Sequence, residues 1–121
     1  MKYPEDFINK IINADCLEIM KQLPDKCVDL IISDPPYGLN YRSNRGAKTG
    51  NLKDYIVNDK PEEFVDLIKK VIPEMIRVLK KDSEIYWFCC GGGSEPVLAY
   101  AWLEFKKFDP ELKVKNLLVW D

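Results

Sequence analysis

A long helix pattern stands between two strand patterns, and this order constrains the fold most. The segment at 61–81, PEEFVDLIKKVIPEMIRVLKK, carries apolar residues at helical spacing along one face, and Pro61 suits its first turn. Before it, VDLIIS at 28–33 is nearly continuously apolar, as in a strand covered on both faces. After it, EIYWFCC at 84–90 is also strand-like. Strand, helix and strand in this order predict a parallel sheet.

Segments on either side continue the alternation. FINKIINAD at 7–15 predicts a short strand, and CLEIMKQL at 16–23 predicts a short helix that Asp15 caps. SEPVLAYAWLEFKKF at 94–108 predicts a second long helix, and VKNLLVW at 114–120 predicts a last strand. We therefore expect one α/β domain over residues 1–121, with a mostly parallel sheet and helices on both faces.

Composition excludes several classes of function. The chain has 121 residues, 18 basic and 20 acidic side chains and no histidine, so a wholly basic nucleic-acid binder and histidine-based catalysis are excluded. Its four cysteines form no CxxC pair, which favours reduced thiols and predicts no metal site. No apolar run has the length of a membrane span and no signal peptide is evident, so we expect a cytoplasmic protein without a membrane partner.

The hexapeptide SDPPYG at 33–38 is the main candidate for a functional site. Asp34 follows the apolar strand directly, and ligands of open α/β sheets bind beyond the carboxyl ends of the strands. Pro35 and Pro36 have no amide hydrogen, so the turn presents only acceptors, which are the Asp34 carboxylate and the Pro35 carbonyl. Tyr37 adds an aromatic face on which a planar ring could stack. The alternative is an ordinary surface turn.

These groups suit chemistry on the exocyclic amine of a base. The lone pair of such an amine is delocalised into the ring, which makes the nitrogen a poor nucleophile. Two acceptors that hold its hydrogens out of the ring plane would localise that lone pair toward an electrophile. The catalytic gain would come from positioning and electrostatics, and no strong general base is required.

The hexapeptide and its surroundings resemble a known family. The stretch NADCLEIMKQLPDKCVDLIISDPPYGL at 13–39 is similar to the N-terminal part of beta-class (permuted) DNA amino-methyltransferases, and the order of elements extends the resemblance to 119–121. These enzymes use S-adenosylmethionine and carry an Asp-Pro-Pro-Tyr tetrapeptide. The resemblance implies a partial Rossmann-like methyltransferase sheet and methylation of the adenine amine in double-stranded DNA, as in restriction–modification systems of prokaryotes or phages.

The resemblance also assigns roles to residues. It implies a target-amine pocket made of Asp34, Pro35, Pro36 and Tyr37. Asp34 would also lie near the methionine end of the cofactor, while Asp15 and Cys16 would contact the cofactor's adenine. A plain helix N-cap explains Asp15 equally well.

The chain also departs from the family's pattern. The cofactor loop, a strand followed by a Phe-x-Gly-x-Gly turn, is absent, and the glycines at 91–93 lack its spacing, which favours a simple turn. We therefore expect a truncated or split methyltransferase domain, which would associate with itself or with a complementing chain. The sequence leaves open a non-catalytic half-domain that binds a partner chain.

The stretch from Gly38 to Asn58 has no periodicity and contains a cluster of basic residues around a tyrosine. The residues that could contact DNA phosphates beside a flipped-out base are Tyr41, Arg42, Arg45 and Lys48. An ordinary solvated loop is the alternative. The leading function is thus DNA adenine methylation. Cytosine amine, RNA and a protein glutamine amide remain alternative targets, and the family's cytosine and protein-amide enzymes usually begin the tetrapeptide with serine and asparagine.

Overall fold

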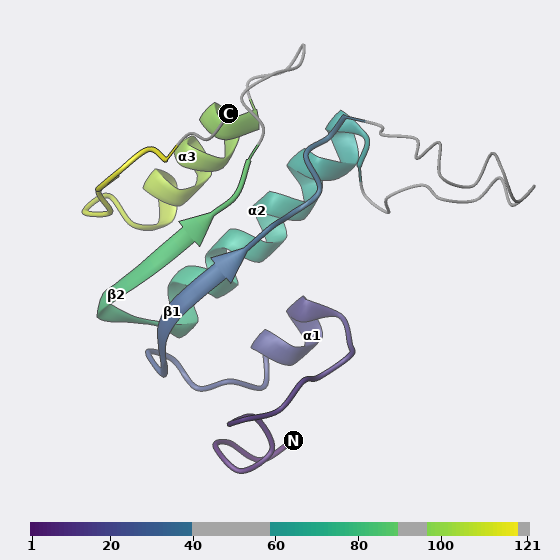
Figure 1. The fold of residues 1–121 in the computed structure, drawn as a ribbon, viewed down its shortest axis with the longest axis vertical. Helices are drawn as coiled ribbons and strands as arrows, with labels where there is room; N and C mark the ends of the chain where they lie inside the picture. Colours follow the sequence, from purple (N-terminus) through teal and green to yellow (C-terminus); the bar gives the residue numbers. More distant parts are fainter. Residues whose placement is uncertain (40–58, 90–96, 119–121) are drawn as a thin grey trace, which may run out of the picture.

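The computed structural model describes residues 1–39, 59–89 and 97–118 (Figure 1). The elements along the chain are α1 (Cys16–Met20), β1 (Val28–Ser33), α2 (Pro61–Val78), β2 (Leu79–Trp87) and α3 (Val97–Phe108). Over these ranges, no helix combines the length and the apolar character that a membrane crossing requires.

Strands β1 and β2 pair in parallel, with α2 running between them in the chain (Figure 1). Val28 lies opposite Leu79, and after an irregularity the pairing continues from Leu30 opposite Glu84 to Ser33 opposite Trp87. The expected α/β class with parallel strands is therefore confirmed for the described residues.

The boundary between α2 and β2 differs from the prediction. Leu79 fits the apolar stripe of the helix, so the sequence predicts a helix as far as residue 81, but α2 ends at Val78 and β2 begins at once. The turn before β1 explains the early end. The Lys26 amide donates to the Arg77 carbonyl (3.0 Å) and the Cys27 amide donates to the Val78 carbonyl (2.8 Å), so these carbonyls have partners outside the helix.

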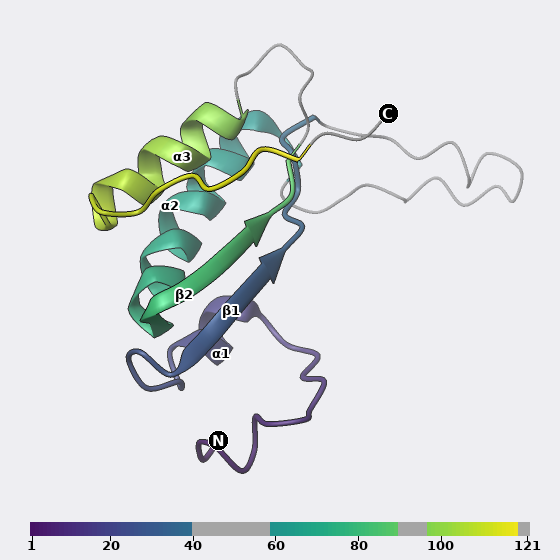
Figure 2. The same ribbon diagram turned by 60° about the vertical axis from the view of Figure 1, so that its left-hand side comes forward.

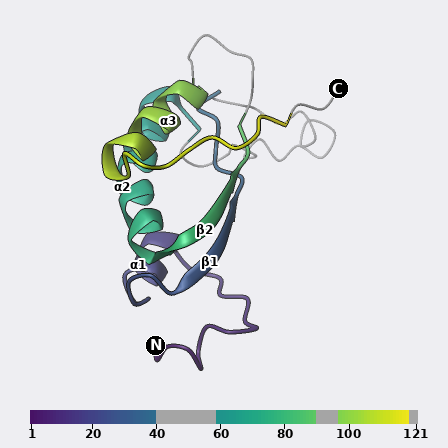
Figure 3. The same ribbon diagram turned by 90° about the vertical axis from the view of Figure 1, so that its left-hand side faces the viewer.

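All three helices pack on the same face of the sheet (Figures 2 and 3). The core is the apolar face of α2 with one residue of α3, and its buried members are Phe64, Ile68, Val71, Ile72, Met75 and Phe105. Partly buried residues of α1 and of both strands pack against it, namely Leu17, Met20, Ile31, Ile85 and Trp87. The ring of Trp87 meets that of Phe105 edge to face at 5.3 Å.

The opposite face of the sheet is open in the described structure. Leu30 and Ile32 alternate with the inward-facing Ile31, and their exposed fractions are 46% and 66%. Among the described residues, the helices therefore pack on one face of the sheet, whereas the sequence predicts a strand at 28–33 that is covered on both faces and a sheet with helices on both faces. The near-continuous apolar run shows that the strand is hydrophobic, but it does not show which elements cover the strand.

Among the described residues, two further predicted strands are not seen. Residues 3–9 are in turns and residues 10–13 have no regular structure, so the strand predicted at 7–15 is wrong. Over 114–118, the described part of the other predicted strand, the chain is also irregular, although Lys115 forms an ion pair with Glu84 of β2. A strand needs a neighbour for its backbone hydrogen bonds, and the described sheet has only β1 and β2. The glycines at 91–93 and the first residues of the helix predicted from 94 lie outside the described residues.

Arg77 fastens α1 and the following turn to the last turn of α2. Its guanidinium donates to the carbonyls of Met20 (2.7 Å) and Leu23 (2.9 Å) and pairs with Glu74 (2.8 Å) and Asp25 (2.6 Å). The hydrogen bonds to Glu74 and Asp25 raise the pKa of Arg77 above its ordinary value. The planar fork of five donors suits this site, and a lysine could not reproduce it.

A pair of isoleucine substitutions tests the one-sided core. Ile72 is fully buried, so Ile72→Ala should cost about 2–5 kcal/mol of unfolding free energy through lost burial and a residual cavity. Ile32→Ala, at the open face of β1, should cost less than about 1 kcal/mol. Urea denaturation followed by circular dichroism measures both, and equal losses would mean that the outer face of β1 is covered in solution.

Candidate active site

The Asp34–Gly38 turn lies at the carboxyl end of β1, as the sequence predicts. Asp34 directly follows the last residue of the strand, and its side chain is exposed. Pro35, Pro36 and Tyr37 are half-buried. The Phe88 amide donates to the Ser33 carbonyl (2.9 Å), which continues the pairing one residue beyond β2 and fixes the start of the turn.

Tyr37 and Asp34 are joined by a short hydrogen bond. The Tyr37 hydroxyl donates to Oδ1 of Asp34 at 2.5 Å. A donor bonded to a carboxylate makes a strong, directional contact, so the tyrosine orients the carboxylate. The side chains that the sequence assigns to the amine and to the face of the ring, Asp34 and Tyr37, are therefore in contact.

A buried carboxylate holds the other side of the turn. Asp59 is 3% exposed, and its Oδ1 accepts hydrogen bonds from the backbone amides of Tyr37 (3.0 Å) and Leu39 (3.3 Å). Burial of a carboxylate is unfavourable unless hydrogen bonds compensate it, and these two amides provide such bonds. Asp59 thereby joins the turn after β1 to the residues that precede α2.

Gly38 brings the turn against the first turn of α2. Its φ of +69° is in the region that favours glycine, and a Cβ at this position would lie 3.2 Å from Cβ of Phe64 and 3.2 Å from Cα of Pro61. Both the backbone conformation and the close approach therefore require a residue without a side chain.

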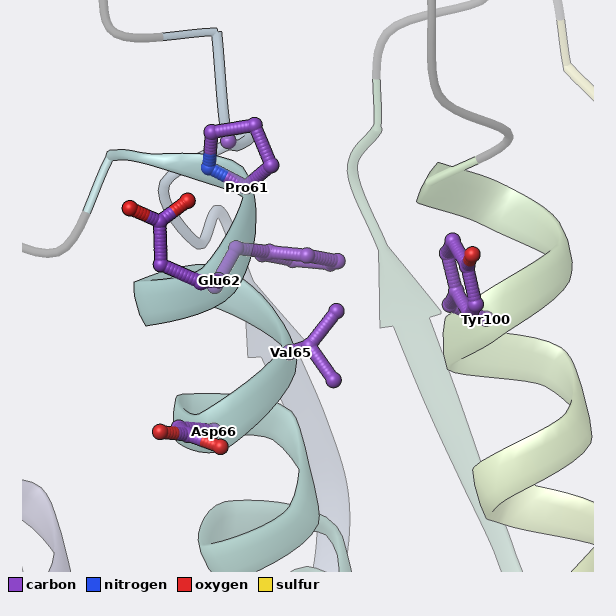
Figure 4. Close-up of a pocket in the computed structure, with 7 residues that line it drawn as sticks. Pro61, Glu62, Val65, Asp66 and Tyr100 are labelled. Atoms are coloured by element: carbon purple, nitrogen blue, oxygen red, sulfur yellow. The ribbon is translucent and has the colours of Figure 1, made fainter.

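A groove of about 390 Å³ opens beside this contact, between the first turns of α2 and α3 (Figure 4). It is lined by Gly38, Pro61, Glu62, Phe64, Val65, Asp66 and Tyr100. Val65 and Tyr100 face each other from the two helices, whereas the carboxylate of Glu62 points away from Tyr100. Asp34 and Tyr37 do not line the groove, so it adjoins the Asp34–Gly38 turn only through Gly38.

The structure does not bring Asp15 and Cys16 together with Asp34. Oδ1 of Asp15 accepts from the amides of Leu17 (2.9 Å) and Glu18 (3.2 Å), so Asp15 is the N-cap of α1 that the sequence predicts. Helix α1 lies beside the amino-terminal half of β1, whereas Asp34 follows the other end of that strand (Figure 1). Both Asp15 and Cys16 are exposed, and no described hydrogen bond joins them to residues 34–37.

Some predicted features lie outside the described residues. These are the candidate DNA contacts Tyr41, Arg42, Arg45 and Lys48. Within the described ranges, no group of three or more His, Cys, Asp or Glu side chains is placed to hold a metal ion.

Sequence reasoning missed Asp59. Its carboxylate reaches residues that lie 20 and 22 positions earlier, and a pattern of local spacing cannot reveal such a contact. One signal was present, because Asp59 is the acid nearest the point where the non-periodic stretch gives way to the helix that begins at Pro61.

Comparison with known proteins places the chain among DNA methylases. The family model for N6/N4 methyltransferases, described as DNA methylase, matches residues 28–121. The Type II methyltransferase M.BamHI of Bacillus amyloliquefaciens is 37% identical over 79 residues, which cover 65% of this chain and 17% of the relative. The DNA adenine methyltransferase YhdJ of Escherichia coli (strain K12) is 37% identical over 76 residues, which cover 63% of this chain and 23% of the relative.

A third relative matches nearly the whole chain. The Type II methyltransferase M.MjaVI of Methanocaldococcus jannaschii is 27% identical over 118 residues, which cover 92% of this chain and 53% of the relative. The chain thus spans between about a sixth and about half of the length of these relatives. No solved structure matches it.

Substitution of Gly38 tests the close approach of the turn to α2. Gly38→Ala should lower the unfolding free energy by about 1 kcal/mol or more, since alanine is strained at positive φ and its methyl group would crowd Phe64 and Pro61. Leu39→Ala, at the exposed neighbouring position, should cost less than about 0.5 kcal/mol. Thermal unfolding of both variants is the measurement, and a neutral Gly38→Ala would contradict the described turn.

Proposed function

This chain belongs to the N6/N4 DNA methylase family, and on that premise we propose that it provides the target-amine site of a DNA adenine methyltransferase. The observation that carries the proposal is the position of Asp34, an exposed carboxylate at the carboxyl end of a parallel strand, oriented by the Tyr37 hydroxyl. Ligands of open α/β sheets bind at such ends.

Asp34 and Pro35 supply the acceptors for the amine hydrogens. The Asp34 carboxylate accepts one hydrogen and the Pro35 carbonyl accepts the other, so the nitrogen lone pair is directed out of the ring plane. Oδ1 of Asp34 already accepts from Tyr37, which leaves Oδ2 as the oxygen for the amine. Pro36 stiffens the turn, and the ring of Tyr37 offers a face for the base.

The cofactor is S-adenosylmethionine, which supplies the methyl group when bound. The exposed Asp34 carboxylate suits the ammonium group at the methionine end of such a ligand. Asp15 and Cys16 are proposed for its adenine end. Oδ1 of Asp15 is engaged in capping α1, so Oδ2 is the oxygen proposed for the cofactor.

Adenine is the proposed target base. The Asp-Pro-Pro-Tyr form of the tetrapeptide favours adenine by resemblance, and YhdJ is named as a DNA adenine methyltransferase. The proposed DNA partner is double-stranded, with phosphate contacts from Tyr41, Arg42, Arg45 and Lys48. Since these 121 residues contain no Phe-x-Gly-x-Gly turn, we expect methyl transfer to need that turn from further polypeptide, either covalently continuous or on a complementing chain.

The open face of the sheet also supports a second proposal, that this chain associates with another polypeptide chain. Leu30, Ile32 and Tyr86 form an exposed apolar surface on β1 and β2, and sheet faces of this kind are normally covered. A complementing methyltransferase chain, or a second copy of this chain, is the proposed cover.

Substitution of Asp34 tests the proposed function. Asp34→Ala should reduce methyl transfer at least about a hundredfold, since removing one preorganised electrostatic contact to a reacting group costs on that order. Because Asp34 is exposed, unfolding free energy should change by less than about 0.5 kcal/mol. The assay follows labelled methyl groups from S-adenosylmethionine into duplex DNA, with the chain alone and with a chain that carries the glycine turn.

Asp29→Ala is the matched control, since Asp29 is an exposed acid of β1 that pairs with Lys80. Nucleoside analysis of the product identifies the methylated base. N6-methyladenine supports the proposal, whereas N4-methylcytosine would show that the target base is cytosine and not adenine. Undiminished methyl transfer by Asp34→Ala would refute the role of this residue. Micromolar binding of S-adenosylmethionine by residues 1–121 alone would show that no further polypeptide is needed for the cofactor.

A further inference from the structure

Asp59 is the one buried charged or polar residue among those the structure describes. It belongs neither to the Asp-Pro-Pro-Tyr tetrapeptide nor to the core cluster. Burial of this side chain at 3% exposure is unfavourable unless hydrogen bonds compensate it, and the two amide donors at 3.0 Å and 3.3 Å do so. Because burial of a carboxylate is costly, we expect the position of Asp59 to serve a role in the site.

The hydrogen bonds of Asp59 act on Tyr37 in particular. Its carboxylate holds the backbone nitrogen of Tyr37, while the hydroxyl of the same tyrosine holds the carboxylate of Asp34. The three residues therefore form a continuous series of contacts from the buried interior to the exposed end of β1. The second bond, to the amide of Leu39, restrains the chain on the other side of Gly38.

We propose that Asp59 is a positioning residue for the target-amine site: it fixes the backbone of Tyr37, and through the Tyr37 hydroxyl it fixes the direction of the Asp34 carboxylate. This inference rests on the proposed function, in which Asp34 accepts a hydrogen of the amine. Asp59 itself touches no substrate, since it is buried beneath the turn.

Packing alone does not hold Tyr37 in this way. Gly38 lies close to Pro61 and Phe64 of α2, but that approach locates the backbone one residue beyond Tyr37, whereas the hydrogen bond from the Tyr37 amide goes to Asp59. Without Asp59, the Tyr37 and Leu39 amides would lose the acceptor that faces them, and the turn would relax to satisfy them elsewhere. Displacements of about 1 Å in a reacting geometry can cost about a hundredfold in rate.

The first test is independent of activity and uses nuclear magnetic resonance of the 121-residue chain. In Asp59→Ala, hydrogen exchange at the amides of Tyr37 and Leu39 should accelerate at least about tenfold, because the acceptor of both is lost. The carboxyl carbon resonance of Asp34 should move toward its position in Tyr37→Phe, which lacks the hydroxyl donor. Amides in the middle of α2 should keep their exchange rates.

Asp59→Asn and Asp82→Asn complete the set. Asparagine keeps an oxygen at the position that accepts from both amides, so Asp59→Asn should restore most of the protection and the Asp34 resonance. Asp82→Asn removes an exposed carboxylate of β2 and should change neither signal. If Asp59→Ala does not fold, Asp59→Ser is used in its place. The same faster exchange and the same shift of the Asp34 resonance are expected, because the serine side chain is too short for its oxygen to reach both amides.

The second test uses the methyl-transfer assay. In Asp59→Ala, kcat should fall between about tenfold and a hundredfold, while KM for DNA stays within about threefold, because the reacting geometry is altered and the DNA contacts are not. A changed KM with unchanged kcat, or an unchanged Asp34 resonance, would overturn the positioning role. If the unsubstituted chain transfers no methyl group even together with a chain that carries the glycine turn, the adenine methyltransferase proposal fails. The resonance of Asp34 still decides whether Asp59 positions it.

Discussion

Burial of the apolar face of α2 is the constraint on which the described structure depends. This helix contributes most of the core and contacts α1, α3 and both strands. Its first turn receives Gly38, and its last turn carries Arg77, which holds α1 and the turn before β1. The candidate site and the opposite end of the sheet are therefore organised by the two ends of one helix.

The elements that could be predicted from sequence are those whose signal is local. The stripe of α2 and the apolar run of β1 are periodic patterns, and the position of Asp34 follows from them. The end of α2 was missed because Leu79 satisfies the stripe while its backbone pairs with Val28. The strand at 7–15 was predicted from β-branched residues, but strand formation depends on a partner that the described residues do not provide.

The candidate site contains two carboxylates in opposite environments, and both accept hydrogen bonds from Tyr37. Asp34 is exposed and can meet a ligand, whereas Asp59 is buried and bonded to backbone amides. The tetrapeptide identified Asp34 because its neighbours in sequence are distinctive. No distinctive sequence surrounds Asp59. Its hydrogen bonds to Tyr37 and Leu39 form when folding brings residue 59 back beside the turn, so they can be identified from a structure and not from the sequence.

The direct passage from Val78 of α2 to Leu79 of β2 has a consequence for the length of the chain here. No residue separates the helix from the strand, and an offset in the pairing follows at once: residues 80–83 of β2 lie between the Val28–Leu79 and Leu30–Glu84 pairs, opposite the single residue Asp29 of β1. One residue inserted within Glu84–Trp87 would slip the strand and exchange its inner and outer faces, whereas one inserted within residues 80–83 would enlarge an irregularity that already exists. Chain length is therefore fixed most strictly over Glu84–Trp87, and insertions or deletions in the evolution of this strand should concentrate at residues 80–83.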